Sequence, residues 1–270
     1  MTMLEATGVA TAIAIAGVAL PLAVAATLDS LGEQVWEGLL LYKRLDEYGE
    51  PKRWSRPVRT LLNSYTSLAF WTAGVCVVLD GATREPTLSN CAAAAPLFNI
   101  LLGVACMWTG VASFAFHASL TEVWRILDAG ATMGVPFLPA SLAFYRLALS
   151  VVPGLPSTPF ALAGLAANVG CHFLARTPGW SDIVLPACIL AHIAIDYVLL
   201  ARFRTREDVT SLAVFVSCAL SGIALRVADI KLHRSVPLIW LGHSCWHLLM
   251  AFAIWTAYSS SLRHAEPFCA

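Results

Sequence analysis

The chain has 270 residues, of which 58% are hydrophobic and only 13% are charged, about half the charged share of an average soluble domain. With a mean hydropathy of +0.71, its apolar residues must face lipid as well as a protein core. The 17 basic and 17 acidic residues balance, and the basic residues form no long patch, which leaves no compositional case for nucleic-acid binding.

The first element in chain order is an N-terminal apolar segment, residues 1–28, whose continuous apolar run is about 20 residues long. That length suits a spanning helix better than the core of a signal peptide. The residues before the run include Glu5 but no lysine or arginine, which is also unlike a signal peptide. Because Ala23-Val24-Ala25 resembles a cleavage site, signal anchor and signal peptide both stay open, with an uncleaved helix favoured.

Residues 29–60 form the most polar segment of the chain and carry six of its basic residues. Its apolar residues have a partial helical periodicity, which predicts an interfacial helix followed by a turn at Gly49 and Pro51. A solvated linker between two membrane segments is an equally good interpretation of the same composition.

Seven further apolar segments follow, each about 17–22 residues long, which is enough to cross a bilayer. Pro136, Pro139 and Pro186 lie inside these segments and predict kinked helices, which lipid tolerates. We therefore predict an all-α membrane protein, a seven-transmembrane-helix bundle over residues 61–258 with an additional N-terminal apolar helix and a short tail at 259–270. The predicted spans lie near residues 61–79, 96–117, 126–146, 158–175, 181–201, 210–228 and 236–257.

The basic residues are shared unevenly between the two faces of this predicted bundle. The face that holds residues 29–60 carries 11 of the 17 lysines and arginines. The positive-inside rule therefore places that face in the cytosol, an orientation that a cleaved N-terminal segment would contradict.

The eight cysteines mostly lie inside the apolar segments, and no two of them form a C-x-x-C pair. This pattern argues against a disulfide framework and against a zinc site built from thiolates. Small apolar packing residues within helices are the ordinary role of cysteines in such positions.

Two polar patterns interrupt the apolar segments. Ser113 and His117 lie four residues apart at the end of the second core segment, and His243 and His247 have the same spacing in the seventh. On a helix, residues four apart share a face, one turn from each other. Asp128 begins the third segment, and the alternation of the spans brings all three positions to the same membrane face. Ionisable groups at membrane depth are expensive and are usually kept for function.

Three imidazoles from two helices form a suitable set of zinc ligands, because zinc takes neutral imidazole nitrogen and three histidines leave a fourth position for water. Zinc acidifies that water and polarises a carbonyl. Asp128 could orient the water or accept its proton, and Ser113 could hydrogen-bond the water or a developing oxyanion. A single membrane histidine more often makes an interhelical hydrogen bond, so the prediction depends on the joint pattern.

The set Ser113, His117, Asp128, His243 and His247 resembles the alkaline ceramidase branch of the CREST superfamily, whose members are seven-helix membrane hydrolases. In that family a serine and a histidine lie one turn apart on the second helix. An aspartate starts the third helix, and two histidines lie one turn apart on the seventh. The five residues match that pattern position by position, with similar spacing.

The resemblance covers roughly residues 57–258, including the stretch 62–68, which is similar to the Asn-rich opening of the family's first helix. The chain departs from the family at two places. The acidic calcium-binding run of alkaline ceramidases, Asp-Trp-Cys-Glu followed by Asn, has no match in residues 29–60, so calcium regulation is not carried over. The N-terminal segment, residues 1–28, is additional to the plain seven-helix form.

The resemblance implies that zinc is bound by His117, His243 and His247, while Asp128 and Ser113 support the bound water. The implied reaction is hydrolysis of the amide bond of ceramide or a related lipid amide, in sphingolipid metabolism. The implied substrate is therefore a ceramide-like membrane lipid. The implied location is a multi-pass position in the membrane of the endoplasmic reticulum or Golgi.

Other interpretations of the same residues stay open. A receptor or signalling protein of the progestin/adiponectin receptor type would use the metal site structurally, and a Per1-like hydrolase would remodel lipids. A transporter would move protons through the intramembrane His and Asp residues, although no inverted repeat is evident. His192 and Asp196, four apart on the fifth core segment, could support the site, form a proton path or make an interhelical hydrogen bond.

Overall fold

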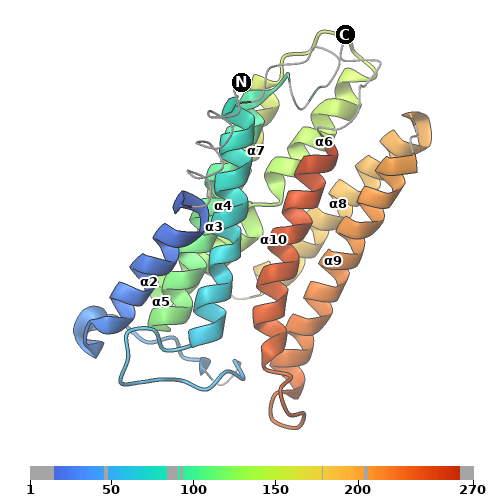
Figure 1. The fold of residues 1–270 in the computed structure, drawn as a ribbon. Helices are drawn as coiled ribbons and strands as arrows, with labels where there is room; N and C mark the ends of the chain where they lie inside the picture. Colours follow the sequence, from blue (N-terminus) through green and yellow to red (C-terminus); the bar gives the residue numbers. More distant parts are fainter. Residues whose placement is uncertain are drawn as a thin grey trace.

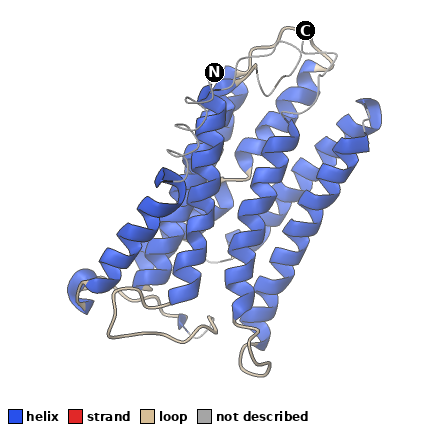
Figure 2. Cartoon of the chain, viewed as in Figure 1, coloured by secondary structure: helices blue, strands red, loops and turns tan. Residues whose placement is uncertain are grey.

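The computed structural model describes residues 15–45, 48–83, 91, 94–177, 179–203 and 206–261. Within these residues the regular structure is helical, apart from one isolated antiparallel bridge between Leu41 and Thr121 (Figure 2). The predicted all-α class is therefore confirmed. The long helices run side by side in one bundle (Figure 1). The predicted tail at 259–270 is helical as far as Ser261 and beyond that lies outside the described residues.

All seven predicted core segments are helical. The third is divided at Val135 and Pro136, where the proline ring interrupts the backbone hydrogen bonds and produces the expected kink. Pro186, in contrast, lies within a continuous helix. The core helices are α3 (Leu61–Thr83), α4 (Pro96–Ser119), α5 (Glu122–Gly134), α6 (Phe137–Leu149), α7 (Thr158–Leu174), α8 (Trp180–Phe203), α9 (Arg206–Leu232) and α10 (Leu241–Ser261).

Five helical segments among the described residues are long and apolar enough to cross a membrane. α7 is apolar but shorter than these five segments. α10 is long enough but is not among the five, because His243 and His247 lower its mean hydropathy. These lengths and compositions identify a multi-helix membrane protein. The five segments are Leu61–Thr83, Pro96–Ser119, Glu122–Leu149, Asp182–Leu199 and Val209–Leu232.

The N-terminal apolar segment is helical where it is described, as a π-helical turn, η1 (Ile15–Ala19), followed by α2 (Leu20–Ser30). It lies against α3 (Figure 1), where Trp71 Nε1 donates a hydrogen bond to the carbonyl of Ala16 at 2.9 Å. Residues 1–14 of the predicted segment lie outside the described residues. The segment is therefore an additional helix beside the core bundle.

The predicted interfacial helix in residues 29–60 is wrong. After α2 the described residues of this segment contain no α-helix, only short 3-10 turns such as Glu33–Trp36. The described remainder, residues 37–45 and 48–60, is an irregular strap that crosses the end of the bundle where α3 begins and α4 ends (Figure 1). An extended chain suits this position because its backbone groups can bond to helix termini.

Glu50 joins the strap to the first turn of α3. Its carboxylate accepts hydrogen bonds from the backbone N–H groups of Leu62 at 2.7 Å and Asn63 at 2.9 Å, donors that a helix N-terminus leaves free. Burial raises the pKa of Glu50 from its ordinary value, while these backbone hydrogen bonds act in the opposite direction. The carboxylate therefore fixes the start of α3 at the same end of the bundle as the end of α4.

α3 and α4 approach each other closely at Gly74 and Gly103. A Cβ atom on Gly103 would lie 2.7 Å from the Gly74 carbonyl oxygen and 2.8 Å from the Val78 nitrogen, both well inside ordinary contact distance. Only glycine therefore fits at this crossing. Nearer the strap, the same pair of helices brings Ser67 Oγ to 3.0 Å from Ser113 Oγ.

The cysteines are mostly unpaired, as their spacing predicts. Six of those in the described residues are free, among them the fully buried Cys106. Cys91, which lies between α3 and α4, is disulfide-bonded. The described residues therefore show no framework of several disulfides, as expected, but the cysteine spacing did not predict the bond at Cys91. No local spacing in the sequence indicates a bond at Cys91.

Replacing Gly103 with alanine is expected to destabilise the protein by roughly 1–3 kcal/mol, because the new methyl group would press against the backbone of α3. The matched control is Gly170→Ala on α7, where a Cβ would meet no atom within 4 Å. That variant should be neutral or more stable by up to about 1 kcal/mol, because alanine favours the helix. Thermal unfolding in detergent micelles measures both, and equal effects would contradict the close-approach argument.

Candidate metal centre

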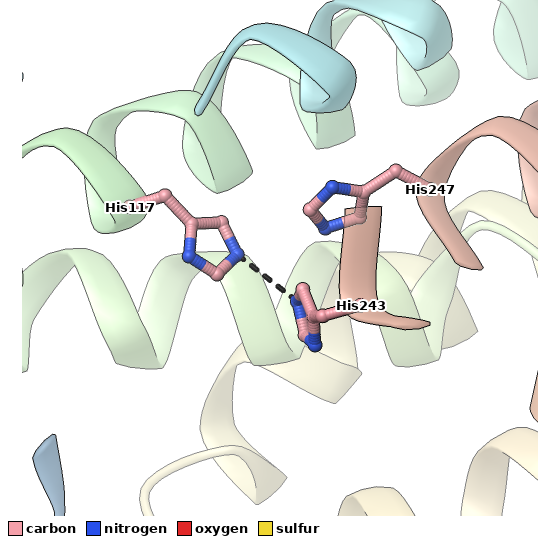
Figure 3. A group of neighbouring side chains, drawn as sticks. All are labelled: His117, His243 and His247. Carbon is pink, nitrogen blue, oxygen red and sulfur yellow. Dashed lines mark hydrogen bonds between the residues drawn. The ribbon is translucent and has the colours of Figure 1, made fainter. Parts of the chain in front are cut away.

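His117 on the last turn of α4 faces His243 and His247 at the start of α10 (Figure 3). The three side chains are buried, with exposed fractions of 0%, 3% and 0%. One possible ligand atom from each lies within 4.8 Å of the others, and His117 Nε2 is 3.2 Å from His243 Nε2. The three histidines predicted from two distant parts of the sequence are therefore brought together.

The nitrogen positions fit a shared metal ion. In a tetrahedral zinc site with Zn–N bonds of about 2.0–2.1 Å, two imidazole nitrogens lie about 3.3–3.4 Å apart. The separation of 3.2 Å between His117 Nε2 and His243 Nε2 is close to that value. His117 Nδ1, His243 Nδ1 and His247 Nε2 are buried without a hydrogen-bond partner. Because one possible ligand atom from each of the three buried rings lies within 4.8 Å of the others, the cluster could hold a metal ion.

Thr66 on α3 contacts His247 at Nδ1. Its hydroxyl lies 2.7 Å from the Leu62 carbonyl and 3.0 Å from His247 Nδ1, and when its one proton goes to the carbonyl, Nδ1 is the donor in the second contact. A neutral imidazole protonated at Nδ1 has its lone pair at Nε2, the ring nitrogen without a partner. α3 thus orients His247 as outer hydrogen bonds orient histidine ligands in metal sites.

The strap holds His117 in place through the end of α4. The last carbonyls of a helix have no partner within it. Here Thr60 donates to the His117 carbonyl through its backbone N–H at 3.2 Å and its hydroxyl at 2.7 Å, and Arg59 N–H donates to the Ala118 carbonyl at 3.0 Å. Tyr48 of the strap lies edge-on to His117, with ring centroids 5.6 Å apart. The strap therefore both ends the helix and covers the histidine ring.

Asp128 and Ser113, predicted as catalytic residues, lie beside each other. The carboxylate of Asp128 interacts with the hydroxyl groups of Ser113 and of Thr132, the second at 3.5 Å. Ser113 Oγ lies 3.0 Å from Ser67 Oγ, which in turn is 3.5 Å from His247 Nδ1. A row of hydroxyl groups thus connects the carboxylate to the histidine cluster.

A cavity of about 220 Å³ opens beside the cluster, between the strap and α5, α8, α9 and α10. Asp128 and His243 both line it, so the carboxylate and one candidate ligand face the same space. Trp246, Thr132 and Leu185 separate it from an apolar pocket of about 30 Å³ within the bundle, because the three residues line both. The remaining polar lining residues are Tyr42, Arg44, Tyr48, Arg125, Asp182 and Arg226.

Four residues of this site have no motif that identifies them from sequence: Thr66, Ser67, Tyr48 and Arg226. The hydroxyl residues lie in the stretch 62–68, but nothing in their spacing predicts which histidine they contact. Arg226 of α9 packs its guanidinium over Trp246, 5.2 Å from the ring centroid, an arrangement that depends on how two helices pack. Only tertiary structure brings these side chains to the cluster.

His192 and Asp196 form a separate group. His192 Nε2 lies 3.4 Å from Asp196 Oδ2, and Asp196 Oδ1 lies 3.4 Å from an Arg146 guanidinium nitrogen on α6. The contact of His192 with Asp196 lies within α8, whereas the contact of Asp196 with Arg146 links α8 to α6, so of the three interpretations the structure supports an interhelical link through Asp196. His192 also lies on the wall of the apolar pocket, apart from the three-histidine cluster.

Comparison of the chain with protein-family models and with curated proteins returns no match. A functional assignment therefore depends on the site itself, namely a buried three-histidine group in a helical membrane protein.

Metal analysis of the purified protein is expected to find one zinc ion per chain, and His243→Ala should lower that content at least about tenfold because one of three ligands is lost. The matched control is His233→Ala. His233 follows the end of α9 and its Nδ1 contacts the Asp229 carbonyl, outside the cluster, so its removal should leave the metal content unchanged. Equal metal content in wild type and His243→Ala would contradict the assignment.

Proposed function

We propose that this protein is a zinc-dependent membrane hydrolase that cleaves the amide bond of ceramide or a related lipid amide, built as seven transmembrane helices with an additional N-terminal helix. The observation that carries the proposal is that Asp128 and His243 line one polar cavity beside three buried imidazoles with unpartnered nitrogens. Metal-assisted hydrolysis needs such a combination of metal ligands, a carboxylate and space for a reacting group.

Each predicted residue has a role in this proposal. His117, His243 and His247 hold the zinc ion, which supplies Lewis-acid chemistry when bound. Asp128 orients the attacking water and accepts its proton on a carboxylate oxygen. Ser113, hydrogen-bonded to Asp128, keeps that carboxylate in place and has a hydroxyl that can also stabilise a developing oxyanion.

The surroundings of the site support a lipid substrate. The polar cavity lies beside apolar side chains, among them Phe70, Phe215 and Ile254 around a pocket of about 30 Å³, so polar and apolar surroundings meet next to the site. The site also lies at the end of membrane-spanning helices, where lipids can enter from the bilayer. By the family resemblance we further propose a location in the endoplasmic reticulum or Golgi membrane. By the distribution of lysine and arginine we propose that the strap lies on the cytosolic side.

Asp128→Asn is expected to reduce fatty-acid release from ceramide by about 10²–10⁴-fold, because the amide keeps the shape of the carboxylate but cannot accept a proton. The zinc content should stay at the wild-type value, since Asp128 is outside the three-histidine group. The matched control is Asp80→Asn at the far end of α3, where the carboxylate accepts a hydrogen bond from Tyr258. Its hydrolysis rate should equal that of wild type in the same mixed-micelle assay.

Two outcomes separate this proposal from its rivals. A wild-type protein that contains zinc but releases no fatty acid from ceramide is not a ceramide amidase. A receptor would bind a ligand without turnover and would keep its response in Asp128→Asn, because that substitution leaves the metal ligands intact.

A further inference from the structure

We propose that the polar cavity binds a phosphate monoester on the lipid headgroup and that Arg226 is its principal anchor. This inference rests on the proposed function and names its substrate class: a lipid amide that carries a phosphate close to the bond to be cleaved. The observations that support it are the absence of an ion pair at Arg226 among the described residues, the buried position of its Nε atom and the place that Arg226 shares with His243 on the wall of the cavity.

Arg226 lies within the membrane-spanning part of α9, six residues before the helix ends at Leu232, a distance of about 9 Å along the axis. Its Nε atom is buried and has no hydrogen-bond partner, and its guanidinium lies over the Trp246 ring. Among the described residues no carboxylate forms an ion pair with it. It is therefore an unpaired cation in an apolar segment.

Such a cation is expensive to keep at membrane depth and is usually paired or functional. The ring of Trp246 compensates in part, because a cation over an aromatic face is attracted to it. The electrostatic influence of Arg226 reaches Asp128 and all three histidines, which places its charge beside the candidate metal centre. An anionic ligand in the cavity would complete its pairing.

The arginines of the cavity differ in their partners. Three arginines and two aspartates line it, and the hydroxyl groups of Tyr42 and Tyr48 add further polar groups. Arg125 is engaged by Glu122 at 2.8 Å, which leaves Arg226 as the better candidate for an incoming ligand. Guanidinium groups bind phosphate through two parallel hydrogen bonds, a geometry that a neutral hydroxyl headgroup does not match.

Arg226 and His243 pack on the same indole. The guanidinium lies 5.2 Å from the Trp246 centroid, and the His243 ring lies 5.3 Å from the Trp246 ring. Both residues also line the cavity of about 220 Å³. A phosphate bound to Arg226 would therefore lie in the cavity beside the histidine cluster. Binding of the headgroup would then position the substrate's amide bond beside the cluster.

Calorimetric binding to the full-length protein, reconstituted with zinc in lipid nanodiscs, tests this inference without requiring turnover. The probes are dodecyl phosphate and dodecanol, which share one chain and differ in the phosphate. Dodecyl phosphate should bind at least tenfold more tightly than dodecanol. Arg226→Gln should weaken phosphate binding by about 10- to 100-fold. Arg226→Lys keeps the charge but cannot make two parallel hydrogen bonds to phosphate, so it should weaken binding by a smaller factor.

The matched control is Lys231→Gln, which removes an exposed cation from the end of the same helix and should leave both affinities unchanged. Zinc content at the wild-type value would show that Arg226→Gln is folded. Equal affinities for the two probes, or equal effects of Arg226→Gln and Lys231→Gln, would overturn the inference while ceramide hydrolysis could still hold. Phosphate binding through Arg226 without any lipid-amide hydrolysis would instead support the anion site and contradict the proposed function.

Discussion

The end of α4 imposes the constraint on which this site depends. A membrane helix must stop there, present His117 to α10 and leave none of its last carbonyls unpaired in an apolar setting. The strap meets all three requirements, because Thr60 bonds the His117 carbonyl and Arg59 bonds the next one along. The same strap fixes α3 through Glu50, so one irregular segment aligns both helices around the cluster.

α3 supplies no candidate ligand, yet it shapes the candidate metal centre. Its Thr66 hydroxyl contacts Nδ1 of His247 at 3.0 Å, and its Ser67 Oγ lies 3.5 Å from the same nitrogen and 3.0 Å from Ser113 Oγ. These contacts require α3 to lie at a fixed depth and distance from α4, which the close approach of the two helices at Gly103 provides. Helix packing in the middle of the bundle thus determines chemistry at its end.

The helices and the histidine cluster could be predicted because their signals are local: long apolar runs, and two pairs of polar residues four apart on one helical face. The strap could not be predicted, because the apolar residues of segment 29–60 follow a helix-like spacing but serve tertiary contacts, as when Trp36, just before the strap, donates from Nε1 to the Pro57 carbonyl within it. Arg226 is likewise ambiguous in sequence, since only the packing of α9 against α10 brings it over Trp246.

The strap also bears on specificity. It supplies Tyr42, Arg44 and Tyr48 to the polar cavity. The strap is thus one wall of the space that a headgroup would occupy, whereas the histidine cluster is held by α4 and α10. A substrate phosphate bound to Arg226 of α9 would lie in the cavity that this wall closes, so the groups that contact a headgroup and the candidate metal ligands come largely from different elements of one bundle.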